Sequence, residues 1–253
     1  IRLRHARQGA DGVNMLLQGE RLDDLQFGGL MLIQRADAYC FTSDAVLLAN
    51  SVAVSSGDKV ADLGAGSGII SVIIAAKRGA NVTAVEFQPW AADLIRRNAA
   101  LNNLSDKISV YEGDINGCGK VLPVFDAAVS NPPYFRAGSG EVRGDVRSAL
   151  SRHESTCTLE DLARESARLL REGGRFYMVH KVERMAEALT RLSNNNLQPK
   201  QVTLIYPKPD RQADTFIVTA VKGGRPGMKL SSLTVYGRDG EMTAEAAKLY
   251  GKI

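Results

Sequence analysis

The sequence predicts an α/β fold in which a mostly parallel sheet of seven strands closes with an antiparallel hairpin. Short apolar runs typical of buried strands alternate with stretches typical of helices. A glycine-rich turn joins the first apolar run to a helical segment, which forms the strand-turn-helix unit of parallel sheets. Two final β runs flank a short turn rich in Pro and Asp, and such a pair predicts a hairpin.

The predicted elements follow one another in order along the chain. Thr158 begins a helix that Gly173 and Gly174 are expected to end, and a helix-like segment lies near the end of the chain, at 243–250. The strands are expected at residues 59–63, 81–86, 108–112, 125–130, 174–180, 201–206 and 216–222, and the helices before the tail at 69–76, 158–170 and 183–194.

The composition narrows the setting of the protein. Of its 253 residues 44% are hydrophobic, but the longest apolar run, 69–76, is far too short to cross a bilayer. We therefore expect a soluble, cytoplasmic protein with no membrane partner. Cys40, Cys118 and Cys157 are spaced neither as a disulfide framework nor as metal ligands, so we expect reduced thiols and no metal.

A glycine-rich turn at 62–68 is the first candidate for ligand binding. Its glycines allow the backbone to approach a ligand closely, and the N–H groups at the start of the next helix favour a polar or anionic group. A dinucleotide site would need its third glycine at position 69, where this chain has Ile69. The spacing favours S-adenosylmethionine instead, and the predicted cofactor-binding residues here are Asp62, Gly64, Ala65, Gly66 and Gly68.

Acidic residues follow the next two strands. Glu86 lies about twenty residues beyond the turn, where a carboxylate can accept hydrogen bonds from both ribose hydroxyls. The alternative is a solvent-facing acid at a strand end, but its position after the turn favours a ribose ligand. Asp114 is expected to meet the adenine amine, and the neighbours Phe87 and Ile115 are included in the predicted cofactor site.

The tetrapeptide Asn131-Pro132-Pro133-Tyr134 follows the fourth strand and contains the predicted catalytic residues. The amine of adenine, or the amide of glutamine, is a poor nucleophile because its lone pair is delocalised. The Asn131 side-chain oxygen and a backbone carbonyl can accept hydrogen bonds from its two N–H groups, while the prolines stiffen the loop and Tyr134 offers a stacking face. An isolated tetrapeptide of this kind favours a tight turn. Its place beyond a cofactor turn favours methyl transfer to a planar nitrogen instead. Asn131 is also included among the predicted cofactor-binding residues.

Basic residues are concentrated near the end of the predicted sheet. The net charge is +4, and 200–230 holds six basic and two acidic residues, an excess of four that equals it. The loop at 135–156 carries both signs of charge, so a solvated loop is the alternative there. Basic segments that flank a base-sized pocket suit a phosphate backbone, and we expect them to do so here. The residues in 200–230 are Lys200, Lys208, Arg211, Lys222, Arg225 and Lys229 against Asp210 and Asp214.

Six segments together resemble a known family. They are 41–49, 62–70, 85–86, 131–135, 152–154 and 206–208. Over nearly its whole length the chain resembles the bacterial tRNA (adenine-N6)-methyltransferases that modify adenosine 37 of tRNA1(Val), immediately 3′ of the anticodon. These are Rossmann-like class I S-adenosylmethionine-dependent enzymes.

The resemblance implies the roles of several residues. Phe41, Thr42 and Asp44 would cover the methionine end of the cofactor. The Asn131 side chain and the backbone at Pro132 would bind the target amine, and Tyr134 would stack on it. The implied partner is tRNA, and we expect a monomer or weak homodimer.

The resemblance also implies an organisation and leaves alternatives. Residues 1–50 would form an N-terminal extension and cofactor-covering segment, 51–225 the methyltransferase core, and 226–253 a tail packed on it. The Asn-Pro-Pro-Tyr segment also occurs in glutamine methyltransferases acting on release factors and in guanine-N2 rRNA methyltransferases. Both remain alternatives, as does a non-catalytic RNA-binding module.

Overall fold

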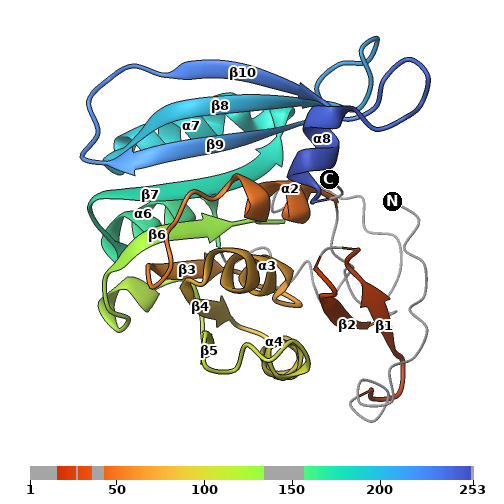
Figure 1. Ribbon diagram of the computed structural model, residues 1–253. Coiled ribbons are helices and arrows are strands. Elements are labelled where there is room, and N and C mark those ends of the chain that lie inside the picture. Colours follow the sequence, from red (N-terminus) through yellow and green to blue (C-terminus); the bar gives the residue numbers. More distant parts are fainter. Residues whose placement is uncertain (1–15, 27, 36–42, 134–156, 252–253) are drawn as a thin grey trace, which may run out of the picture.

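A computed structural model describes residues 16–26, 28–35, 43–133 and 157–251, and these residues form an α/β fold around one large sheet (Figure 1). Across the sheet the strands follow the order β10-β8-β9-β7-β6-β3-β4-β5. Their bounds are Lys59–Leu63 for β3, Asn81–Glu86 for β4, Ile108–Glu112 for β5, Phe125–Ser130 for β6, Leu170–Lys181 for β7, Leu197–Tyr206 for β8, Thr215–Lys222 for β9 and Lys229–Thr234 for β10.

The mostly parallel sheet with a terminal hairpin is confirmed. Among the described strands of this large sheet, only β9 runs antiparallel to its neighbours, β7 and β8. The sheet has eight strands rather than the expected seven, because β10 pairs in parallel with β8 from Lys229 to Thr234. Apolar patterning does not reveal β10, since Leu233 is its one buried side chain.

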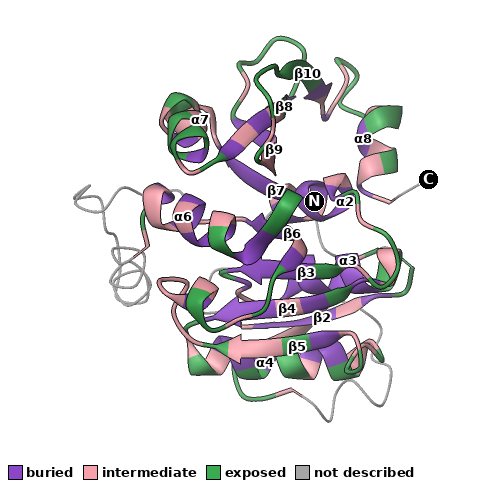
Figure 2. Ribbon diagram, turned by 90° about the vertical axis from the view of Figure 1, so that its left-hand side faces the viewer, coloured by how far each residue is buried: buried purple, intermediate pink, exposed green. Residues whose placement is uncertain are grey.

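Helices cover both faces of the sheet (Figure 2). One face packs against α2, α3 and α8, and the other against α6 and α7. Alternate residues of a strand therefore enter different cores: Val60 of β3 joins the first and Ala61 the second. The bounds are Ser43–Ser51 for α2, Ile69–Arg78 for α3, Pro89–Leu101 for α4, Leu159–Leu169 for α6, Met185–Asn194 for α7 and Ala244–Leu249 for α8, with 3-10 turns at Cys118–Lys120 and Val182–Arg184.

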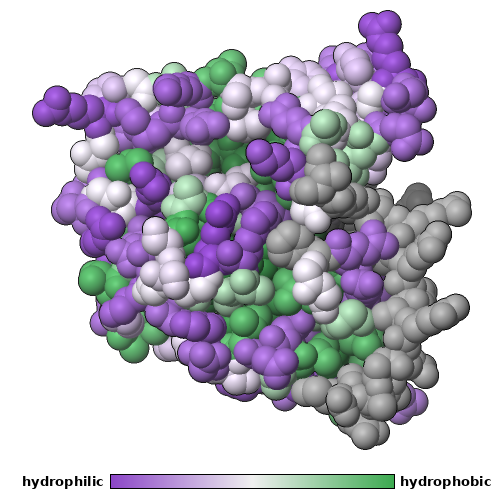
Figure 3. Space-filling view, viewed as in Figure 1, coloured by the Kyte–Doolittle hydropathy of each residue, from purple (hydrophilic) through white to green (hydrophobic). Residues whose placement is uncertain are grey.

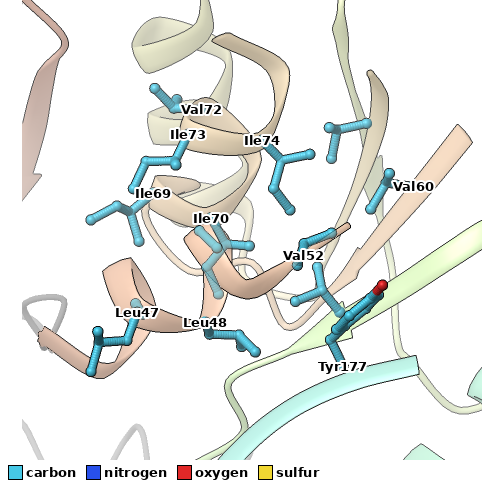
Figure 4. Close-up of a cluster of buried hydrophobic side chains, with 14 of the residues drawn as sticks. Leu47, Leu48, Val52, Val60, Ile69, Ile70, Val72, Ile73, Ile74 and Tyr177 are labelled. Atoms are coloured by element: carbon cyan, nitrogen blue, oxygen red, sulfur yellow. The ribbon is translucent and has the colours of Figure 1, made fainter. Parts of the chain in front are cut away.

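The first core lies between α2, α3 and the sheet (Figure 4). Leu48 of α2 and Ile70 of α3 meet there, and Tyr177 of β7 closes the cluster from the sheet side. The chain's last described helix also belongs to this core. Tyr250, directly after α8, is 5% exposed and its hydroxyl shares a hydrogen bond with Ser43 at the start of α2.

The start of α6 is confirmed and its predicted end is wrong. The Thr158 hydroxyl accepts a hydrogen bond from the Asp161 N–H at 3.1 Å, and the Asp161 carboxylate accepts one from the Thr158 N–H at 3.0 Å. The helix ends at Leu169, so Gly173 and Gly174 lie inside β7 rather than at a helix cap. A Cβ atom at Gly174 would lie 2.8 Å from the Arg171 carbonyl oxygen, so the irregular start of β7 requires glycine there.

A two-stranded hairpin lies outside the large sheet and was not predicted. It consists of β1, Glu20–Asp24, and β2, Met31–Arg35, and β2 packs against α4. Arg97 of α4 forms a two-bond ion pair with Glu20, with both N–O distances at 2.7 Å. Burial alone would raise the pKa of Glu20, but its hydrogen bonds and the charge of Arg97 hold that pKa below its ordinary value.

No helix of the described segments is long and apolar enough to span a membrane.

Candidate active site

The predicted site residues meet at the carboxyl edge of the parallel strands. The glycine turn follows β3, Glu86 ends β4, Asp114 lies just after β5, and Asn131 directly follows β6. β3 pairs with both β4 and β6, so the turn lies between Glu86 and Asn131. Open α/β sheets bind their ligands at this edge.

The glycine turn has a left-handed backbone at three positions. The φ angles are +73° at Gly64, +58° at Gly66 and +80° at Gly68. Side chains other than glycine rarely adopt such angles, which explains the alternating glycines. The Gly64 N–H donates to the Val85 carbonyl at 3.0 Å and thereby holds the turn against β4.

The three glycines differ in what surrounds them. A Cβ atom at Gly68 would lie 3.1 Å from the side chain of Ile95 on α4, and one at Gly64 would lie 3.7 Å from Ile115. A Cβ atom at Gly66 would meet no described atom within 4 Å. The turn is therefore packed at its end and open at its middle, where a ligand can approach the backbone.

Glu86 connects the turn to the neighbouring elements. Its side chain is 6% exposed, and its carboxylate accepts hydrogen bonds from the N–H groups of Gly66 at 2.8 Å and Gln88 at 2.9 Å. Its backbone carbonyl accepts a hydrogen bond from the Gly113 N–H at 2.9 Å. A carboxylate has about four lone-pair sites, so Glu86 can hold the turn and still accept hydrogen bonds from a ribose.

Asp62 lies fully buried beneath the turn. The Ser71 hydroxyl donates to its Oδ2 at 2.6 Å, while Oδ1 receives no hydrogen bond from the described residues. Burial raises the pKa of Asp62 to about 7, and the charge of Glu86 adds to this, against the opposing hydrogen bonds from Ser71. A buried acceptor of this kind suits a cationic ligand group, and the open backbone at Gly66 also fits S-adenosylmethionine.

The residues after β4 and β5 line the same edge. Phe87 is 46% exposed, unusually high for a large apolar side chain. Asp114 is half-buried, and its Oδ1 accepts a hydrogen bond from the Asn116 N–H at 2.8 Å. Ile115 contacts the position of Gly64, so this segment lies directly beside the turn.

The residue before Asn131 joins the ends of two neighbouring strands. The Ser130 hydroxyl donates to the Leu63 carbonyl at 2.8 Å, which joins the ends of β6 and β3. Asn131 and Pro132 are half-buried, and Pro133 is exposed.

The structure describes only some of the residues that were predicted for the methionine end of the cofactor and for the target site. Asp44 is described and lies in the first turn of α2. Tyr134, Phe41 and Thr42 lie outside the described residues. Within the described segments, no group of three or more His, Cys, Asp or Glu side chains is placed to hold a metal ion.

The six basic residues that were counted together in 200–230 lie at two opposite edges of the sheet. Topology separates them: β8 and β10 begin, and β9 ends, at the amino edge, opposite the site. Hydrophilic side chains gather at the upper left of Figure 3, with smaller hydrophobic areas beside them. Lys208 and Arg211, in the turn between β8 and β9, lie at the carboxyl edge with Asn131. The four at the amino edge are Lys200, Lys222, Arg225 and Lys229.

Some residues that organise the site were not predicted. Ser71 and Ser130 position Asp62 and the end of β6, and Ile95 packs against Gly68. Asn98 of α4 donates to the carbonyl of Ser67 in the turn. One signal for Asn98 is the pair of asparagines spaced four residues apart in 89–102, because two amides recur there on one side of a helix.

Comparison with known proteins gives a family match. The family model described as "methyltransferase small domain" matches residues 41–201. The relatives include proteins named tRNA1(Val) (adenine(37)-N6)-methyltransferase. The protein from Aeromonas hydrophila is 30% identical over 72% of this chain and 76% of the relative, and that from Parabacteroides distasonis is 27% identical over 83% and 90%. The Porphyromonas gingivalis relative is 30% identical, and the match spans 60% of each chain.

Solved structures show the same architecture. A predicted O-methyltransferase from Agrobacterium tumefaciens matches with a TM-score of 0.67 and 26% identity, over 82% of this chain and 95% of that one. A geranyl diphosphate methyltransferase solved with S-adenosylmethionine matches with a TM-score of 0.54 and 18% identity, over 71% and 84% of the two chains. The second match concerns the fold alone.

Proposed function

The chain belongs to the methyltransferase small domain family, and from this premise we propose that it methylates the N6 amine of an adenosine in tRNA, namely adenosine 37 of tRNA1(Val). It is an S-adenosylmethionine-dependent enzyme, as its family and fold require. The observation that carries the proposal is the common edge of the glycine turn, Glu86 and Asn131. Three neighbouring strands bring Glu86, the glycine turn and Asn131 side by side, which supports the roles that we propose for them.

The cofactor site is proposed from the residues around the turn. Glu86 accepts hydrogen bonds from the ribose hydroxyls, Asp114 meets the adenine amine, and Phe87 lies against the adenine. The backbone at Gly66 approaches the cofactor, and Asp62 offers its second oxygen to a cationic group. Phe41, Thr42 and Asp44 would cover the methionine end.

The chemistry is proposed from the residues that follow β6. S-adenosylmethionine supplies an electrophilic methyl group when it is bound. The Asn131 side-chain oxygen and the Pro132 carbonyl accept hydrogen bonds from the two N–H groups of the target amine. These bonds increase the electron density on the nitrogen and fix the direction of its lone pair. Tyr134 stacks on the base. The nitrogen lone pair forms the new bond to the methyl carbon directly, without a metal or a covalent enzyme intermediate. As it does so the carbon–sulfur bond would break, with its electron pair going to sulfur and S-adenosylhomocysteine leaving, and the nitrogen then releases one proton.

The location of basic residues refines the proposed tRNA contact. Lys208 and Arg211 are exposed at the carboxyl edge, where a tRNA that presents its base to Asn131 also brings its phosphates. Arg225 and Lys229 are exposed at the amino edge and serve as a matched control. We place the enzyme in the cytoplasm with its tRNA, as a monomer or weak homodimer.

Charge reversal tests this tRNA contact. The double variant K208E/R211E should raise KM for tRNA by about tenfold, and more at low salt, because two phosphate contacts are lost. The control R225E/K229E should change KM by less than about twofold under the same conditions. Both variants should retain the Kd for S-adenosylhomocysteine, measured by calorimetry. Equal increases of KM in the two variants would contradict the assignment.

The decisive experiment measures transfer of labelled methyl from S-adenosylmethionine to unmodified tRNA. Release factor and rRNA serve as parallel acceptors, and mass spectrometry of nucleosides identifies the product. We expect N6-methyladenosine in tRNA, and tRNA1(Val) transcripts with a guanosine at position 37 should remain unlabelled. Label in release factor, or N2-methylguanosine in rRNA, would overturn the substrate. Cofactor binding without transfer to any acceptor would instead favour a non-catalytic RNA-binding module.

A further inference from the structure

Helix α4 lies behind the cofactor turn and contacts it through two side chains. The helix begins directly after Glu86 and Gln88, and Ile95 packs where a Cβ atom of Gly68 would be, at 3.1 Å. One turn further along, Asn98 donates to the carbonyl of Ser67, inside the glycine turn, at 2.9 Å. The position of α4 and the position of the turn are therefore linked.

Asn98 also holds the β1–β2 hairpin. Its Oδ1 accepts a hydrogen bond from the Ile33 N–H at 2.7 Å, and its Nδ2 donates to the Ile33 carbonyl at 3.0 Å. The side chain is fully buried, and both hydrogens of its amide are used, one on Ile33 and one on Ser67. One amide thus pairs with the hairpin like a neighbouring strand and also binds the cofactor turn.

A second connection runs from the end of the hairpin to the ribose ligand. The Arg35 guanidinium lies over the Trp90 ring at 5.1 Å from its centroid, and the Trp90 indole N–H donates to the Gln88 side chain at 2.7 Å. The backbone N–H of Gln88 donates to the Glu86 carboxylate at 2.9 Å. Strand β2 therefore reaches both halves of the proposed cofactor site, the turn through Asn98 and Glu86 through Trp90.

We propose that Asn98 is a positioning residue that couples docking of the β1–β2 hairpin to the conformation of the cofactor turn. S-adenosylmethionine that binds the turn stabilises the hairpin, and a docked hairpin keeps the turn ready for the cofactor. The coupling is reciprocal, because two events linked through one element shift each other by the same factor. The inference rests on the cofactor part of the proposed function and does not depend on the acceptor.

Asn102, the residue directly after α4, provides a matched control. Its Oδ1 accepts from the Met31 N–H at 3.0 Å, and its Nδ2 donates to the Met31 carbonyl at 2.8 Å. The second hydrogen-bond partner of Nδ2 is the carbonyl of Asn98, within the helix, instead of the cofactor turn. Asn102 therefore holds β2 in the same manner as Asn98 but has no bond to Ser67.

Calorimetry with S-adenosylhomocysteine compares the two asparagines in the full chain. Asn98→Ala should raise the Kd by about tenfold, because it leaves the Ser67 carbonyl without its donor and releases the turn. Asn102→Ala should raise it by less than about threefold, although it removes the same pair of bonds to the hairpin. In steady-state assays the Asn98 variant should raise KM for S-adenosylmethionine with little change in kcat. Equal Kd values for the two variants would overturn the proposal.

Hydrogen exchange of the unmutated protein tests the coupling without any variant. Addition of S-adenosylhomocysteine should slow exchange of the Ile33 amide by roughly tenfold, the factor by which the ligand favours the docked hairpin. The same slowing should persist in Asn102→Ala and disappear in Asn98→Ala. Unchanged exchange of Ile33 at saturating ligand would overturn the coupling even if the cofactor binds. Failure of the unmutated protein to bind S-adenosylhomocysteine would overturn the cofactor site itself, and the coupling with it.

Discussion

Alanine at Gly68 should destabilise the fold, whereas alanine at Gly66 should act mainly on the cofactor. Both glycines have left-handed backbones, with φ of +80° and +58°, and alanine in such a conformation costs about 1–2 kcal/mol at either position. Their surroundings differ. A Cβ atom at Gly68 would lie 3.1 Å from two carbons of Ile95, while one at Gly66 would meet no described atom within 4 Å.

The magnitude follows from this contrast. Ile95 is fully buried, so it cannot move aside, and overpacking against it adds about 1–3 kcal/mol to the backbone cost. Gly68→Ala should therefore lower the free energy of unfolding by about 2–5 kcal/mol, and Gly66→Ala by only about 1–2 kcal/mol. For a chain of this size each kcal/mol lowers Tm by roughly 2–4 °C.

Two measurements separate the effects. Thermal unfolding without ligand reports the stability of both variants, and calorimetry with S-adenosylhomocysteine below the lower Tm reports affinity. The methyl group of Gly66→Ala points into the open space of the turn, so we expect a loss of affinity of about tenfold or more, ~1.4 kcal/mol. The reasoning is refuted if Gly66→Ala is the less stable variant, or if it binds ligand as tightly as the unmutated protein.

Three further predictions concern the carboxyl edge. Asn131→Ala should lower kcat by at least about a hundredfold and leave the Kd for S-adenosylhomocysteine nearly unchanged, as single-turnover kinetics and calorimetry would show; equal losses in both would contradict its role. Glu86→Ala should do the reverse and raise that Kd by about tenfold or more, because the ribose loses a charged acceptor; an unchanged Kd would remove Glu86 from the site. Burial raises the pKa of Asp62 from 3.8 to about 7 on folding, so the folded state binds the extra proton and stability should fall by about 1 kcal/mol per pH unit as pH rises between these values. Urea unfolding at pH 5 and pH 8 should show that Asp62→Asn lacks this loss of stability. Equal pH dependence of the unmutated protein and Asp62→Asn would contradict the raised pKa of Asp62.

The elements that carry the site were predictable because their sequences are locally consistent. β3, β4 and β6 are short apolar runs with a clear change of chemistry at their carboxyl ends. The glycine turn follows β3, Glu86 is the last residue of β4, and Asn131 follows β6. The common edge then follows from the geometry of parallel strands.

Features that depend on tertiary contacts were not predictable from local pattern. Strand β10 exposes most of its side chains and exists because it pairs with β8. The β1–β2 hairpin docks through backbone groups that bond to Asn98 and Asn102, and such bonds leave no apolar periodicity in 20–35. The basic residues of 200–230 were grouped by sequence, but a hairpin places neighbours along the chain at opposite edges.

The contact between Tyr250 and Ser43 has a practical consequence for work with this protein. Residues after α8 close over the first turn of α2, the helix that carries Asp44. The Tyr250 ring is enclosed, with 5% of the residue exposed, and this burial raises the pKa of its phenol to about 12, against the opposing hydrogen bond with Ser43. An affinity tag fused directly after this segment, or a stop codon placed before Ala244, would disturb the helix that carries Asp44, a proposed cofactor contact. A tag with a long flexible spacer is the safer choice for purification.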